Sequence, residues 1–134
     1  MEIGVREGIS TSAILAGIEE NGGHLWSFDI NDCRVFDGHP DWTFTQANTI
    51  ADSAKVRAAI PSDIQMLFVD GDHSYEGALS DLENFGPLAR RIFVHDTDCP
   101  DTYPGVRKAV EEFISKSGRS VRWHSGSYGM AEIE

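Results

Sequence analysis

The sequence predicts an α/β protein in which a mostly parallel sheet is covered by helices on both faces, and three observations indicate this fold class. Short apolar runs alternate along the chain with segments whose apolar residues recur at helical spacing. Two of these runs, Met66–Val69 and Ile92–Val94, are continuously apolar, as expected for strands buried on both faces. The last two apolar runs are separated only by a Ser/Gly turn, which indicates a terminal antiparallel hairpin.

The first helix can be delimited at both ends. We expect a strand over Glu2–Val5, followed by a helix for which Ser10 or Thr11 serves as the N-cap. Asn21–Gly23 ends this helix, because glycine readily adopts the left-handed conformation that closes a helix. One apolar face of the helix consists of Ala13, Ile14, Leu15 and Ile18.

The remaining elements continue the alternation around one long irregular segment, Asn31–Asp41, which is a candidate active-site loop. Ser74 precedes an apolar-faced helix and is a good N-cap for it. Five strand–helix alternations and a hairpin predict a seven-stranded, Rossmann-like doubly wound sheet. In order, we expect further elements over Leu25–Ile30, Trp42–Ala47, Ala54–Ile60, Met66–Val69, Tyr75–Phe85, Ile92–Asp96, Val106–Ile114, Ser120–His124 and Gly129–Ile133.

Length and composition restrict the possible functions. At 134 residues we expect one domain, residues 1–134, with no room for helices ahead of the first strand. A net charge of −11 repels nucleic-acid phosphates, and the only basic pair, Arg90-Arg91, is short, so we expect no nucleic-acid partner. No apolar run is long enough to span a membrane, and the start of the chain does not have a signal-peptide pattern. Cys33 and Cys99 fit neither a metal site nor a disulfide framework, which favours free thiols in the cytoplasm.

Polar residues stand at every predicted strand end, and four of the five ends carry a carboxylate. Ligands of open parallel sheets bind beyond the carboxyl ends of the strands, where these side chains would gather. Structural turns at such ends are usually closed by Gly, Asn or Ser, so this many acids indicates a functional site. The segments concerned are Gly4–Ser10, Asp29, Gln46–Asn48, Asp70–His73 and His95–Asp98.

The opening segment, Glu2-Ile-Gly-Val-Arg-Glu-Gly-Ile-Ser-Thr, indicates a cofactor that contains a nucleoside. Gly4 ends the strand and Gly8 begins the helix, so a charged ligand can approach bare backbone at a helix N-terminus. Asp29, at the end of the second strand, has the position of an acid that binds a ribose. A nicotinamide cofactor is disfavoured, because the Gly-x-Gly-x-x-Gly fingerprint lacks its middle glycine here and no Tyr-x-x-x-Lys pair is present.

The chain resembles class I S-adenosylmethionine-dependent methyltransferases, and in particular small O-methyltransferases whose fourth strand ends in Asp-Gly-Asp-His-Ser-Tyr-Glu. The matching segments are the opening one, Phe28-Asp29, Val69–Gly77 and Val94-His95-Asp96. The resemblance implies that Glu2 and the Gly4–Gly8 turn hold the methionine part of the cofactor, with Ser10 or Thr11 donating to its carboxylate. It further implies that Asp29 binds the ribose, Ala47 and Asn48 read the adenine edge, and Asp70 lies beside the transferring methyl group.

Two mechanisms remain open for the acceptor side of the predicted site. Related O-methyltransferases use Mg²⁺, which Asp70 and Asp96 would hold here, together with His95 or Asp98. Imidazole is a poorer Mg²⁺ ligand than carboxylate, so His73 or His95 could instead act as a general base without a metal. A third interpretation is that the histidines are simply hydrogen-bonded to neighbouring acids.

The predicted reaction is methylation of a hydroxyl on a small molecule, such as a sugar or a phenolic metabolite. Amino-directed methyltransferases of nucleic acids typically carry an Asn/Asp-Pro-Pro-aromatic motif after the fourth strand, and Asp70–His73 contains no proline. The alternatives are a non-catalytic domain that retains the fold and, less favoured, a nicotinamide-dependent oxidoreductase. Because little would cover the cofactor, we expect a homodimer or a partner subunit to complete the site.

Overall fold

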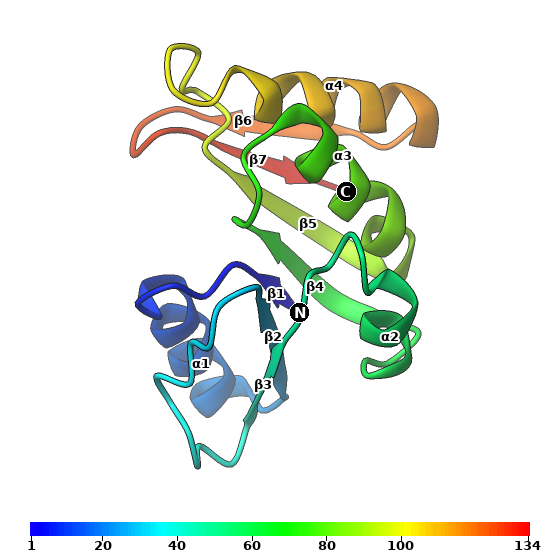
Figure 1. Ribbon diagram of the computed structural model, residues 1–134. Helices are drawn as coiled ribbons and strands as arrows, with labels where there is room; N and C mark the ends of the chain where they lie inside the picture. Colours follow the sequence, from blue (N-terminus) through cyan, green and yellow to red (C-terminus); the bar gives the residue numbers. More distant parts are fainter.

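The computed structural model describes residues 1–134 and contains one seven-stranded sheet flanked by helices (Figure 1). The strands lie in the order β3-β2-β1-β4-β5-β7-β6, and only β7 runs antiparallel to its neighbours. The predicted fold class, a mostly parallel doubly wound sheet with a C-terminal antiparallel hairpin, is therefore confirmed. The elements are β1 (Glu2–Ile3), α1 (Ile9–Asn21), β2 (Leu25–Asp29), β3 (Trp42–Gln46), α2 (Ser53–Ala58), β4 (Ile64–Val69), α3 (Tyr75–Phe85), a 3₁₀ turn (Gly86–Leu88), β5 (Ala89–His95), α4 (Pro104–Ser117), β6 (Val121–His124) and β7 (Met130–Ile133).

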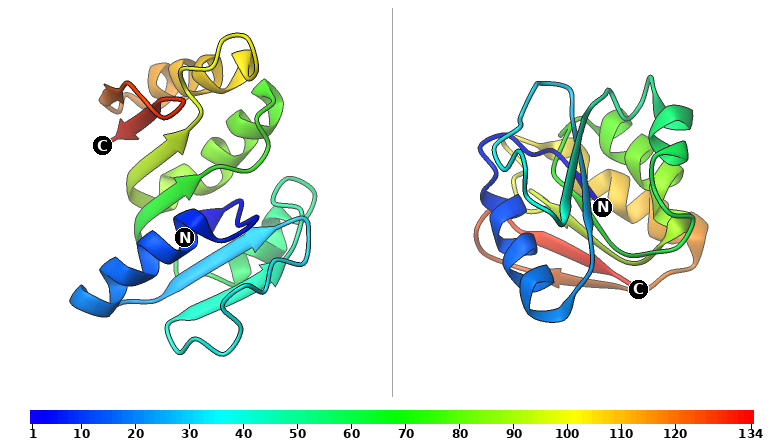
Figure 2. Two further views of the ribbon diagram at one scale, coloured as in Figure 1. Left: turned by 90° about the vertical axis from the view of Figure 1, so that its left-hand side faces the viewer. Right: turned by 90° about the horizontal axis from the view of Figure 1, so that it is seen from below.

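The two faces of the sheet carry different numbers of helices. Helix α1 lies alone on one face, whereas α2, α3 and α4 lie on the other (Figures 1 and 2). The larger apolar core fills the three-helix face and includes Leu82 and Phe85 from α3, which are fully buried. A smaller cluster of Val5, Leu15, Leu25 and Trp42 packs beneath α1. None of the helices combines the length and apolar character that would be needed to cross a membrane.

Three local predictions were wrong. Helix α1 begins at Ile9 with Gly8 as its N-cap, since the Ser10 and Thr11 hydroxyls hydrogen-bond elsewhere. The count of five strand–helix alternations is one too high, because no helix joins β2 to β3; segment 31–41 is irregular, as predicted. Arg90 and Arg91 lie inside β5 rather than before it.

The two arginines of β5 do not form a free basic patch. Arg90 makes a two-pronged ion pair with Asp63 at 3.1 and 2.6 Å, and Arg91 pairs with Glu134 and, at 3.6 Å, with Glu132. The acidic partners offset both charges.

Strands β1 and β4 approach so closely that only glycine fits at position 4. The Asp70 N–H donates to the Ile3 carbonyl at 2.8 Å, and the Gly4 N–H donates to the Phe28 carbonyl at 2.9 Å. A Cβ on Gly4 would lie 2.1 Å from the Asp70 carbonyl oxygen, and Gly4 has a left-handed φ of +90°. This contact joins the turn after β1 to the turn after β4, and so brings two of the predicted site segments together.

Replacing Gly4 with alanine should therefore destabilise the fold strongly. We expect the Gly4→Ala variant to lose about 3 kcal/mol of unfolding free energy, because the left-handed backbone costs about 1–2 kcal/mol and the clash adds a similar amount. Gly38→Ala is the matched control, since Gly38 has a similar φ of +87° but open space around it; it should lose about 1 kcal/mol. Urea denaturation measures both, and equal losses would contradict the claimed close contact.

Candidate functional site

The turn from β1 into α1 presents a helix N-terminus whose N–H groups are not capped by side chains. Gly8 is the N-cap residue, with φ +79°; no side chain accepts a hydrogen bond from the first N–H groups of the helix, and its first turn contains no acid. A Cβ on Gly8 would lie 2.6 Å from Val35 and 2.8 Å from Phe36, so the loop between β2 and β3 packs directly against this turn. Free N–H groups and the helix dipole together favour an anionic ligand group here.

Glu2 lies beneath this turn rather than at its surface. Its side chain is completely buried, and its carboxylate accepts hydrogen bonds from Ser10 at 2.7 Å, Thr11 at 2.9 Å and Ser27 at 2.6 Å. Burial raises the pKa of Glu2, and the three hydroxyl donors offset part of that effect. In this arrangement the hydrogen bonds of Glu2 with Ser10 and Thr11 hold the β1–α1 turn from its buried side. The polar atoms of these three side chains are therefore already paired with one another.

Asp29 is held at the end of β2 by backbone donors. One carboxylate oxygen accepts from the Val5 and Arg6 N–H groups at 2.9 and 3.2 Å, and the other accepts from the Asn31 N–H at 2.8 Å. Partial burial raises the pKa of Asp29, but these backbone hydrogen bonds outweigh it and leave the pKa below its usual value. The carboxylate is therefore ionised, fixed in orientation and half-exposed beside the β1–α1 turn.

The segment after β3 lies next to Asp29, as the sequence predicts. The Ala47 N–H donates to the Asp29 carbonyl at 2.9 Å, and Ala47 is buried. The Asn48 side chain accepts from the N–H groups of Ile50 and Ala51, both at 3.0 Å, and so closes the following turn. The Asn48 side chain therefore stabilises the loop.

Two exposed aliphatic side chains at this edge were missed by sequence reasoning. Ile30 is 62% exposed directly after Asp29, and Ile50 is 42% exposed two residues after Asn48. Large apolar side chains at this exposure are available to pack against a flat ligand surface. For Ile30, the signal in the sequence was an apolar residue placed directly after the polar end of a strand, Asp29.

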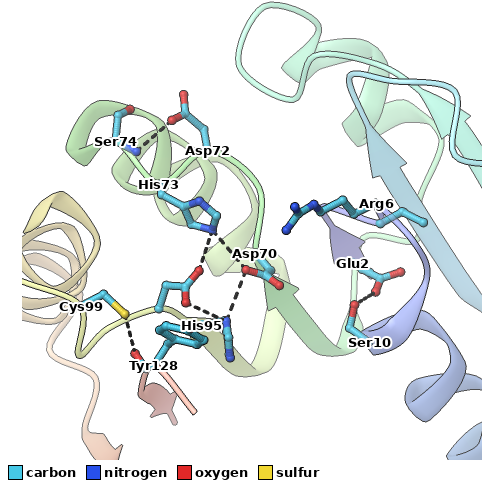
Figure 3. Close-up of polar contacts among 12 residues, drawn as sticks. Glu2, Arg6, Ser10, Asp70, Asp72, His73, Ser74, His95, Cys99 and Tyr128 are labelled. Carbon is cyan, nitrogen blue, oxygen red and sulfur yellow. Dashed lines mark hydrogen bonds and ion pairs between the residues drawn. The ribbon is translucent and has the colours of Figure 1, made fainter. Parts of the chain in front are cut away.

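The ends of β4 and β5 bring Asp70, His73, His95 and Asp96 into one cluster (Figure 3). His73 Nε2 lies 3.2 Å from Asp70 Oδ1 and 2.9 Å from Asp96 Oδ2. His95 Nδ1 lies 3.5 Å from the same Asp70 oxygen and 3.2 Å from Asp96 Oδ1. Two carboxylates are thus bridged by two imidazoles, and all three residues predicted to be catalytic lie within this cluster.

The surroundings of His73 favour its protonated form. The hydrogen bond to Asp70 raises the pKa of His73, burial opposes this, and the charges of Asp96, Asp70 and Asp72 raise it further. The imidazole also stacks on Tyr103, with ring centroids 4.3 Å apart. His73 is therefore held in a fixed orientation between the two carboxylates.

The chemistry of the cluster can accommodate a divalent cation. Ligand atoms of Asp70, His73 and Asp96 lie within 4.8 Å of one another. The set combines two carboxylates with one imidazole, a mixture that suits several divalent metals and is less suited to Mg²⁺ than three carboxylates would be. His73 rather than Asp98 completes this set, because Asp98 is exposed and its backbone pairs with the turn between β6 and β7.

Backbone strain is concentrated at the same edge of the sheet. Only four non-glycine residues have a positive φ, namely Arg6, Asp96, Ser127 and Tyr128. Arg6 lies in the β1–α1 turn, and the Tyr128 carbonyl accepts from the Asp98 N–H at 2.8 Å, two residues after Asp96. Such conformations cost on the order of 1–3 kcal/mol each and are typical of functional sites.

A sizeable cavity of the protein lies elsewhere. It has a volume of about 1090 Å³ and is lined by Met1, Pro61, Ile64 and residues of α1, at the amino ends of the strands. None of the clustered carboxylates or histidines borders it. We therefore place the chemistry at the carboxyl edge, where the charged and strained residues converge.

Several solved structures with the same fold are methyltransferases. The TDP-rhamnose 3′-O-methyltransferase CalS11 of calicheamicin biosynthesis superposes with a TM-score of 0.73 at 19% identity, over 100% of this chain and 70% of that one. The Podospora anserina methyltransferase PaMTH1, bound to SAH, gives 0.74 at 13% identity, over 99% and 69%. MycE of the mycinamycin pathway, in complex with Mg, SAH and mycinamycin VI, gives 0.69 at 17% identity, over 99% and 43%.

Sequence comparison agrees with this similarity of fold. No curated protein matches the sequence significantly. A family model described as a methyltransferase domain matches residues 1–97, which contain the β1–α1 turn, Asp29 and the whole Asp70–Asp96 cluster. The chain therefore belongs to the methyltransferase domain family.

Proposed function

We propose that this protein transfers a methyl group from S-adenosylmethionine to a hydroxyl group of a small molecule. The observation that carries the proposal is the position of the Asp70–His73–Asp96 cluster directly beside an uncapped helix N-terminus and the backbone-held Asp29. Asp29 and the N-terminus of α1 suit a nucleoside ligand that carries an anionic group, and the Asp70–His73–Asp96 cluster suits proton transfer. The SAH bound in related folds such as PaMTH1 and MycE supports the same cofactor here.

The residues fit the cofactor in a definite order along the sheet edge. Asp29, ionised and fixed, can accept two hydrogen bonds from the ribose hydroxyls. The free N–H groups of α1 suit the methionine carboxylate, while the buried Glu2 holds their turn in place. Ile30 and Ile50 offer apolar surface for the adenine ring on either side of the Ala47–Asn48 backbone.

For the acceptor hydroxyl we propose His73 as the general base. Its Nε2–H lies between Asp70 and Asp96 and donates to them, which leaves Nδ1 to accept the hydroxyl proton; the two carboxylates stabilise the imidazolium that forms. Asp70, His73 and Asp96 are also the residues that would hold a divalent cation, whose chemistry would be to orient the hydroxyl and lower its pKa. His95, beside both carboxylates, would help to hold them in position.

Ligand binding tests the cofactor assignment. Isothermal titration calorimetry should show binding of S-adenosylmethionine and SAH, and no binding of NAD, because the β1–α1 turn lacks the middle glycine of the nicotinamide fingerprint. Each titration is repeated with and without Mg²⁺. Binding of NAD alone would overturn the proposal in favour of an oxidoreductase, and binding of none of the three would favour a non-catalytic domain.

The pH dependence of turnover tests the general base. Activity should rise as the pH increases through the folded-state pKa of His73, which lies above 6.5, because only neutral imidazole accepts a proton. The stabilising ion pairs of His73 are fully present below pH 6.5 and are lost over the same rise, so the free energy of unfolding should fall as activity increases. Turnover is measured with whichever sugar or phenol gives the highest rate in a preliminary screen of hydroxyl compounds.

Substitution and chelation complete this test. His73→Gln should lower kcat about 100-fold and abolish the pH step, whereas His24→Gln, at a half-buried histidine directly before β2, should change neither. Most of the activity should survive EDTA. Complete loss with EDTA and recovery with Mg²⁺ or Mn²⁺ would show that a cation, rather than His73, activates the hydroxyl.

A further inference from the structure

Asp81 is a buried carboxylate without a hydrogen-bond partner. It lies on α3, only 1% of its surface is exposed, and it is the only carboxylate in the chain whose buried oxygens are both unpartnered. Burial raises the pKa of Asp81 to about 6. The Thr49 hydroxyl faces the carboxylate and lowers this pKa slightly, although neither carboxylate oxygen has a partner within hydrogen-bond geometry. An unpaired buried acid costs stability, so packing alone does not explain why this position is not apolar like its neighbour Leu82.

The carboxylate lies under the junction of three segments of the proposed cofactor site. A Cβ built on Gly71 would lie 3.8 Å from Asp81 Oδ2 and 3.9 Å from the Gly4 nitrogen, so Asp81 is just below the turn after β4, where it meets the turn after β1. Thr49, which is 9% exposed, approaches from the turn after β3. The one charged group that perturbs Asp81 is Asp72, from the turn after β4, and no cation compensates the two acids.

We propose that Asp81 is a positioning residue for the nucleobase of the cofactor, which sets the spacing between the turn after β3 and the turn after β4. This rests on the proposed function, because Thr49 lies in the same turn after β3 as Asn48 and Ile50, where adenine is placed. Adenine draws the turns together, and the Thr49 hydroxyl then donates to the Asp81 carboxylate. The cost of an unpaired acid in the free protein is thus recovered only when the nucleobase is bound.

A stability measurement and a binding measurement on the same variants test this role. Asp81→Asn removes the charge and Asp81→Leu removes the polar group. Both should raise the urea midpoint, and more at pH 8 than at pH 5, because the wild type loses stability as the pH rises through a folded pKa of about 6. Both should also weaken SAH binding at least tenfold, and Thr49→Val should weaken SAH binding similarly.

A ligand that differs only in its base separates positioning from a general structural role. The wild type should bind SAH more tightly than S-inosylhomocysteine, and Asp81→Asn should reduce this preference at least fivefold. Asp63→Asn, which alters an exposed acid paired with Arg90, is the control and should leave SAH affinity and base preference unchanged. Unchanged SAH affinity in a stably folded Asp81→Asn variant, or equal losses for both ligands, would overturn the inference. Failure of the wild type to bind SAH would instead overturn the proposed function itself.

Discussion

The site depends on the close approach of two strand ends, at Gly4 and Asp70. The hydrogen bond from the Asp70 N–H to the Ile3 carbonyl, and the absence of room for any Cβ on Gly4, place the turn after β1 against the turn after β4. One turn carries the uncapped N-terminus of α1, and the other carries the Asp70–His73 pair. A cofactor lying along the first turn would therefore have its reactive end at the second, which is the geometry that group transfer requires.

Buried carboxylates in this protein follow two different patterns. Glu2 accepts hydrogen bonds from three hydroxyls, so the cost of its burial is offset and the β1–α1 turn is held rigidly. Asp81 has no such donors and remains a cost to the free fold. Glu2, with its hydrogen bonds made, lies beneath the β1–α1 turn that we propose for the methionine end, so this end is preformed. Asp81, without hydrogen bonds, lies beneath the turns after β3 and β4, and we infer that the nucleobase end is completed only by the ligand.

Sequence reasoning predicted the fold and the location of the site, but not how the polar atoms are used. The apolar runs and the Ser74 cap are local signals, so the strand–helix alternation, the terminal hairpin and helix α3 (Tyr75–Phe85) could be derived, whereas the full strand order was not predicted. The roles of Glu2, Ser10 and Thr11 depend on which partners lie beneath the turn, which spacing along the chain does not specify. Asp81 was not singled out at all, because an acid inside an amphipathic helix is indistinguishable from a solvated one until the packing is known.

The most direct test of this account is a crystal structure of the protein grown with SAH. We predict that the ribose hydroxyls lie within hydrogen-bond distance of Asp29 and that the amino-acid end contacts the N-terminus of α1. The sulfur atom should point toward the cluster of Asp70, His73 and Asp96. SAH bound instead in the cavity beside Met1 and Pro61, or with its sulfur directed away from the cluster, would contradict the central claim.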